Sequence, residues 1–293
     1  MPLETLKTYS DAFSQANDAG NLLLDEISPI VSSATPARGK VTCGTSRLGY
    51  PLCFDLIAVR GKDGIRQNED PSIVARRDAL AAVTLYNKML VDLAEGKQTK
   101  DFINQVDELV ILANSVATLG IVPSGGLTAL VPPTASFAKD LAARFGRARA
   151  NATVRQSILQ SKDDIQELLK ALADDTPKIY EVFRKAREAD LFKIGVERKR
   201  ASSAGRTAAV GEADKRLRAM SKSIGQFHES LTAYVKLLDQ TARALEALVV
   251  AAETSPGTVA SAALVLSEAE QIRERSEEFW NAIRKVRITA AGG

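Results

Sequence analysis

The chain has 293 residues, of which 45% are hydrophobic but only 5% are aromatic, and its formal net charge is +3 at pH 7. Few aromatic residues together with abundant Ala, Leu, Glu, Lys and Arg favour helix over sheet. The small net charge does not indicate a nucleic-acid-binding protein, and no segment has the roughly 18 uninterrupted apolar residues of a membrane-spanning helix. The length allows one large domain or two smaller ones.

Apolar residues at the start of the chain recur at intervals of three and four, the spacing of one helix face. They predict a first helix from Leu3 to about Ile30. Pro29 and the small polar residues after it are expected to end this helix, because they disfavour helical backbone. The residues of the apolar face are Leu6, Tyr9, Phe13, Ala16, Gly20, Leu23, Ile27 and Ile30.

The segment from Lys40 to Arg60 is the only strand-like part of the sequence, because of its Gly, Thr, Tyr, Val and Ile content. Cys43 and Cys53 have the same parity, so a β-hairpin would place them on one side within disulfide distance. We expect this disulfide, which predicts a periplasmic or secreted protein; free cysteines would predict a cytoplasmic one. Residues 2–18 are too charged for a signal peptide, so an exported chain would be a mature form.

Two further helices are predicted after a polar loop. Asp70 is a helix N-cap residue before Pro71, a residue that suits the first helical position. The helix that follows ends at Gly96, and a third helix runs from about Thr99 to Leu119. Their apolar faces contain Val83, Tyr86, Leu90 and Leu93, then Phe102, Val106, Leu109, Ala113 and Val116.

An irregular apolar linker follows at residues 120–133, since its Pro and Gly residues would break a helix. Helical spacing resumes after Thr134 and continues to about Ala189, with a kink or a break at Thr176 and Pro177. Residues 201–211 are rich in Ser, Gly and Ala, which predicts a polar loop or a turn at the tip of a hairpin.

The clearest pattern is a coiled-coil repeat that extends over about five heptads. It predicts a long helix from Glu212 to about Glu253 that packs lengthwise on other helices. A last helix with matching spacing follows a short turn, so the two should form an antiparallel hairpin. We therefore predict an all-α fold: a single elongated antiparallel helical bundle over residues 1–293, with coiled-coil-like packing and a small β-hairpin at 40–60. The two series are Leu217, Met220, Ile224, Phe227, Leu231, Tyr234, Leu238, Thr241, Leu245, Leu248 and Ala252, then Ala262, Val265, Ala269, Ile272, Ser276, Phe279, Ile283 and Val286.

Residues with catalytic or metal-binding chemistry form no recognisable pattern. His228 is the only histidine, lies beside the heptad seam and excludes zinc sites that need two histidines. The acid pairs Asp163-Asp164 and Asp174-Asp175 would serve acid–base or metal chemistry only in a shared cleft, and we expect them to be solvated or to cap helices. The sequence therefore predicts no enzyme, no cofactor and no metal site.

Basic residues cluster at two places and are candidates for contact with an anionic membrane surface. The alternative is an ordinary solvated helix face and a charged loop tip. Nucleic acid is not an expected partner, because the clusters contain few aromatic residues for base stacking. The candidate residues are Arg144, Arg147, Arg149, Arg155, Arg198, Lys199 and Arg200.

Residues 110–131 form an apolar segment interrupted by Gly and Pro, in which Leu127, Leu130 and Val131 are candidates for a membrane element. Long helices with one such segment resemble the α-helical pore-forming toxins in general plan, and the resemblance implies that the segment inserts into a membrane. The alternative, which we favour, is that these residues form core where the helices change direction.

The function that these features favour is a non-enzymatic structural or protein-interaction module. We expect it to be exported and to present long helical faces to a protein partner or to another copy of itself. The alternative from a different class is a membrane-active helical protein that uses residues 110–131.

Overall fold

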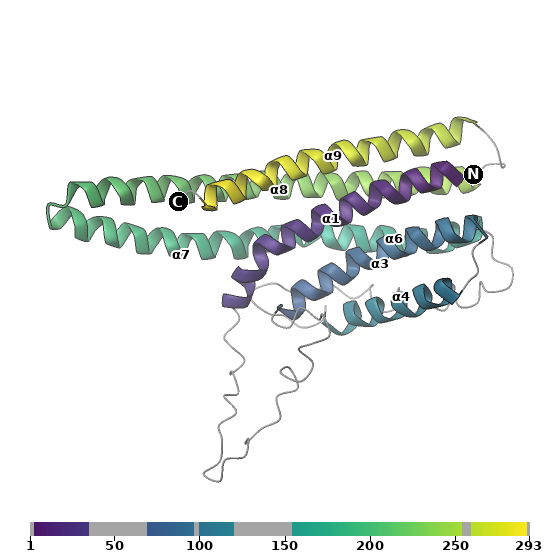
Figure 1. Ribbon diagram of the computed structural model, residues 1–293, viewed down its shortest axis with the longest axis horizontal. Helices are drawn as coiled ribbons and strands as arrows, with labels where there is room; N and C mark the ends of the chain where they lie inside the picture. The colour runs from purple at the N-terminus through teal and green to yellow at the C-terminus, as the bar shows by residue number, and fades with distance from the viewer. Residues whose placement is uncertain (1–2, 35–68, 97–99, 120–153, 254–258, 292–293) are drawn as a thin grey trace, which may run out of the picture.

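A computed structural model describes residues 3–34, 69–96, 100–119, 154–253 and 259–291 (Figure 1). All regular structure in these ranges is helical, so the predicted all-α class is confirmed. The β-hairpin predicted at 40–60 lies outside the described residues. The helices are α1 (Leu3–Ala34), α3 (Pro71–Ala94), α4 (Lys100–Leu119), α6 (Val154–Asp174), α7 (Thr176–Ser203), α8 (Thr207–Glu253) and α9 (Val259–Ala291).

The longest helix, α8, is the centre of the packing. Its 47 residues span about 70 Å, and it contacts α1, α6, α7 and α9. The helices α6 and α7 follow one another along one side of α8, and α9 returns along another (Figure 1). Next to them, α1 packs on α9 and α3, while α4 contacts only α3 among the described helices. Most helices of this part of the chain therefore lie side by side along one long axis.

The apolar seams predicted from sequence form most of the core. The predicted face of α1 is buried except for Ile30, and the series of α9 is buried from Val265 to Val286. In α8 the seam is buried from Phe227 onward, whereas Leu217 is only half-buried. The difference arises because several helices surround the second half of α8, where residues outside the seam are also buried.

We expect Leu238→Ala to lower the free energy of unfolding by about 2–5 kcal/mol, because it removes a buried side chain and leaves a cavity. Leu238 is 3% exposed in the α8 seam, whereas His228 on the same helix is exposed. His228→Ala should therefore change stability by less than about 0.5 kcal/mol. Urea unfolding of both variants checks the pair. Equal losses would show that the seam is assigned to the wrong face.

The predicted end of the first helix is wrong. The helix continues past Ile30 to Ala34, with Pro29 inside it. A proline inside a helix removes one backbone hydrogen bond. Pro29 itself is exposed, but Val31 in the last turn is fully buried, and burial of apolar area offsets that loss.

The turn between α7 and α8 is much shorter than the loop predicted at 201–211. Both helices extend into this range, and only Ala204, Gly205 and Arg206 lie between them. Gly205 has a φ of 69°, in the left-handed region that favours glycine. The N–H of Arg206 donates to the carbonyl of Ala201 at 3.0 Å, the pattern of a Schellman motif. The chain therefore reverses tightly, and the two helices pair up to the turn.

Candidate functional site

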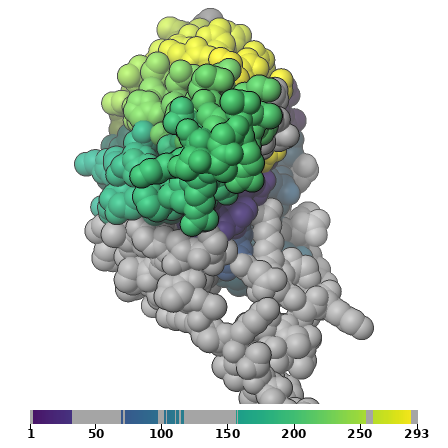
Figure 2. All heavy atoms as spheres, turned by 90° about the vertical axis from the view of Figure 1, so that its left-hand side faces the viewer, coloured from purple at the N-terminus to yellow at the C-terminus, as the bar shows by residue number. Residues whose placement is uncertain are grey.

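The joined ends of α7 and α8 extend past the end of α9 as a two-helix arm (Figure 1). The helices α8 and α9 are antiparallel, and the rings of Tyr234 and Phe279 lie 5.9 Å apart. Ala291, at the end of α9, follows Phe279 by as many residues as Lys222 precedes Tyr234. The end of α9 is therefore level with Lys222 on α8. We call residues 190–222 the arm; it is about 20 Å long by the helical rise. Figure 2 looks at the molecule from this end, with the arm in the foreground.

The arm has a thin apolar core. Of its side chains only Ile194, Ala201 and Ala213 are buried. Two ion pairs connect its helices: Arg198 Nε lies 2.5 Å from Asp214 Oδ1, and Arg216 lies 2.9 Å from Glu197. Such exposed pairs contribute little stability each, typically about 0–1 kcal/mol. Because no third helix of the described ranges packs on it, the arm leaves most of both its helices open.

Charge in the arm is unbalanced. Residues 190–222 contain nine Lys and Arg but four Asp and Glu, a net charge of +5, whereas the whole chain carries +3. Four of these cations have acidic partners within the arm. The other five are exposed and make no ion pair with any described residue: Lys199, Arg200, Arg206, Arg218 and Lys222.

Phe192 is the most exposed large hydrophobic residue among those described, with 74% of its surface accessible. Lys199 follows it by seven residues, or two helical turns, so both lie on one face of α7. Ile194, the residue buried against α8, lies about half a turn away from both. Between them, a Cβ added at Gly195 would meet nothing within 4 Å. We call Phe192, Gly195, Val196 and Lys199, with Arg200 at their edge, the outer face of α7.

The residues predicted to contact an anionic surface differ in their surroundings, and some lie outside the described residues. Arg198 is engaged by Asp214, whereas Lys199 and Arg200 are exposed without an acidic partner in the described ranges. Arg155 lies in α6, but its side chain is outside the description. Arg144, Arg147, Arg149, the membrane candidates Leu127, Leu130 and Val131, and the predicted disulfide Cys43–Cys53 are all outside the described residues.

A buried ion pair joins α3 to the junction of α6 and α7. Arg76 Nε lies 2.6 Å from Asp175 Oδ2, and their side chains are 2% and 6% exposed. A guanidinium nitrogen of Arg76 also donates to the carbonyl of Ser72 at 2.6 Å. The prediction that Asp174 and Asp175 would be solvated or cap a helix is wrong for Asp175, which makes no side-chain cap at α7. Burial raises the pKa of Tyr234, which lies near this pair.

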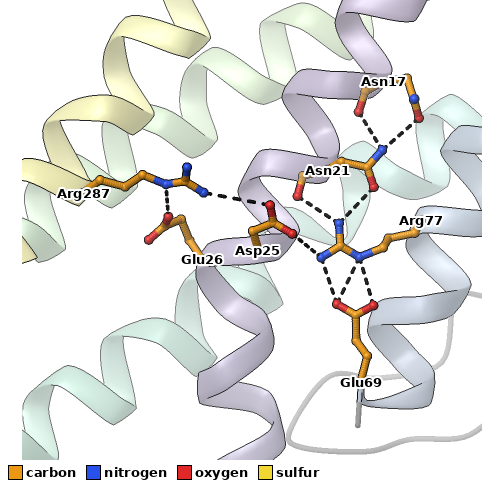
Figure 3. Close-up of polar contacts among 7 residues, drawn as sticks. All are labelled: Asn17, Asn21, Asp25, Glu26, Glu69, Arg77 and Arg287. Atoms are coloured by element: carbon orange, nitrogen blue, oxygen red, sulfur yellow. Dashed lines mark hydrogen bonds and ion pairs between the residues drawn. The ribbon is translucent and has the colours of Figure 1, made fainter. Parts of the chain in front are cut away.

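A second polar network links α9, α1 and α3 (Figure 3). The guanidinium of Arg77 donates to Glu69 at 2.8 Å, to Asp25 at 2.6 Å and to Asn21 at 3.0 Å. Arg287 of α9 pairs with Glu26 on α1. Because these carboxylates are held by guanidinium groups, the network connects helices and does not resemble an acid–base pair free to act on a substrate.

Other chemistry is sparse in the described part of the chain. His228 is exposed, and its ring meets that of Tyr180 edge-on at 5.3 Å. No group of three His, Cys, Asp or Glu residues in the described ranges is placed to hold a metal ion. None of the described helices is both long and apolar enough to cross a membrane.

Sequence reasoning missed two cations of the arm, Arg218 and Lys222. They follow Glu212 and Asp214, so in the sequence they do not continue the earlier basic cluster. It also missed the buried charge on α3, although Arg76 lies three residues after Ile73 and four before Leu80 on the apolar face. That spacing was the available signal.

Comparison of the chain with protein-family models, with curated proteins and with solved structures finds no match.

Proposed function

We propose that this protein is a non-enzymatic interaction module whose long helices hold the arm away from the body of the molecule for contact with a partner. The observation that carries the proposal is the arm itself, which combines open helix faces, five exposed cations without described acidic partners, and the exposed ring of Phe192. Aromatic and Arg side chains are enriched at protein interfaces relative to the rest of the surface.

The body of the molecule supports this role. The ion pair of Arg76 with Asp175 joins α3 to the start of α7, the helix that continues into the arm. Stacking of Phe183 on Phe227 joins α7 to α8 below the arm, with ring centroids 3.8 Å apart. A helix pair anchored in this way presents its far end in a fixed direction, which lowers the entropic cost of binding.

Photo-crosslinking in the native cell tests the proposal. A photoreactive amino acid at Lys199 should give a discrete adduct, because this position lies on the open face of the arm. The same photoreactive amino acid in place of Lys170, an exposed lysine of α6 in the body, is the matched control and should give no adduct. The mass of the adduct distinguishes a second copy of the chain, another protein and a lipid. Equal labelling from both positions, or none from Lys199, would contradict the proposal.

A further inference from the structure

We propose that the outer face of α7 in the arm docks on an anionic lipid bilayer. This inference rests on the proposed function, because it names the partner of the arm. It commits the contact to Phe192, Lys199 and Arg200, and it leaves the body of the molecule in water.

The exposed cations at the end of the arm complement the charge of an anionic bilayer. Lys199 and Arg200 lie in the last turns of α7, and Arg206 begins the chain's return. All three are exposed and have no ion pair with a described residue, so no internal pair must break before they meet an anion. A cation near an anionic membrane surface contributes about 1 kcal/mol of attraction. Glu197 and Asp214 are neutralised by the ion pairs that cross the arm, and Glu212 pairs with Lys215.

The exposed ring of Phe192 also favours a bilayer as the partner. It projects from a helix face on which the neighbouring position, Gly195, carries no side chain and has open space. A bilayer accepts a projecting aromatic ring at the boundary of headgroups and acyl chains without any complementary pocket. Helices that lie in this interface combine Lys and Arg with Phe, Trp or Leu, and the arm has one such ring beside its cations. An acidic protein would satisfy the cations but would need a pocket shaped for the ring.

The geometry supplies a control on the same arm. Arg218 and Lys222 are exposed on α8, but they lie about half a turn around that helix from Ala213, which is buried against α7. They therefore face away from the outer face of α7. At physiological salt the Debye length is about 8 Å, so charges across the arm should contribute little to a contact on the α7 side.

The experiment measures binding of the full chain to vesicles of phosphatidylcholine with phosphatidylglycerol, and to vesicles of phosphatidylcholine alone. We expect binding only to the anionic vesicles. The double variant Lys199→Gln/Arg200→Gln should weaken it about thirtyfold, as expected for two cations. Phe192→Ala should weaken it about tenfold. Arg218→Gln/Lys222→Gln removes the same charge from the opposite side and should change binding less than about threefold.

A second measurement places the ring. The Phe192→Trp variant should show a blue-shifted emission on anionic vesicles and no shift with phosphatidylcholine alone, with Trp280 of α9 as a constant background. The inference is overturned if the native chain does not bind anionic vesicles, if both charge variants weaken binding equally, or if the emission of the Phe192→Trp variant does not shift. An adduct between the Lys199 crosslinker and a protein, without vesicle binding, would overturn the lipid partner while leaving the proposed function in place.

Discussion

Asp175→Asn is expected to lower the free energy of unfolding by about 3–5 kcal/mol, one of the largest effects of any single substitution in this chain. The change preserves the shape of the side chain but removes the carboxylate that Arg76 Nε contacts at 2.6 Å. Arg76 is 1% exposed, so its guanidinium charge would stay in the interior without that carboxylate. Removing one partner of a buried ion pair costs more than the pair itself contributes.

Urea unfolding followed by circular dichroism measures this effect. Asp174→Asn is the matched control, because the neighbouring carboxylate is exposed, and it should change stability by less than about 0.5 kcal/mol. The apolar double variant Arg76→Met/Asp175→Leu should recover most of the loss, since replacing both ions removes the desolvation cost. If Asp175→Asn unfolds at the same urea concentration as the native chain, the pair does not hold α3 to the junction of α6 and α7.

The helices and their buried faces could be predicted largely from apolar spacing. Leu231 and Leu238 recur at heptad distance and are buried, with 5% and 3% of their surfaces exposed, as a single amphipathic face requires. The pattern reports only one face, however. Leu237 and Ala244 are also fully buried, because α6, α1 and α9 approach α8 from other directions. Sequence spacing therefore predicted one buried face of α8, but it did not predict how many helices surround α8.

The buried ion pair could not be predicted because its partners lie 99 positions apart in the sequence. Asp174 and Asp175 are chemically identical, and nothing local indicates which one turns inward. The break between α6 and α7 determines which of the two aspartates points inward. Asp175 lies at the N-cap position of α7 with φ −82° and ψ −18°, and its side chain reaches Arg76. Such a choice depends on tertiary contacts, which local propensity does not record.

The arm was only partly predictable for a related reason. The basic cluster at Lys199 and Arg200 was visible in the sequence, but the sequence did not show whether another helix covers that face of α7. Spacing alone continues the apolar pattern of α7 to Ala189, which the structure leaves exposed. Which faces of α7 are covered by other helices depends on tertiary packing, which the apolar spacing of one helix does not report.

The last prediction compares two phenylalanines of α7. Phe183 is fully buried and stacks on Phe227 at 3.8 Å, with the guanidinium of Arg187 5.1 Å from its ring centroid, whereas Phe192 is 74% exposed. Phe183→Ala should therefore cost about 3–5 kcal/mol of unfolding free energy, through lost transfer energy and a cavity. Phe192→Ala should cost less than about 0.5 kcal/mol.

Thermal and urea unfolding of the two variants decide the comparison, since the substitution is the same and only the position along α7 differs. A large loss of stability in Phe192→Ala would mean that another part of the chain covers this ring, and the outer face of α7 would then not be open for a partner. A small loss of stability in Phe183→Ala would mean that the stack of Phe183 on Phe227 does not anchor the arm. The expected contrast would show that folding does not require the ring of Phe192, as a contact through the outer face of α7 needs.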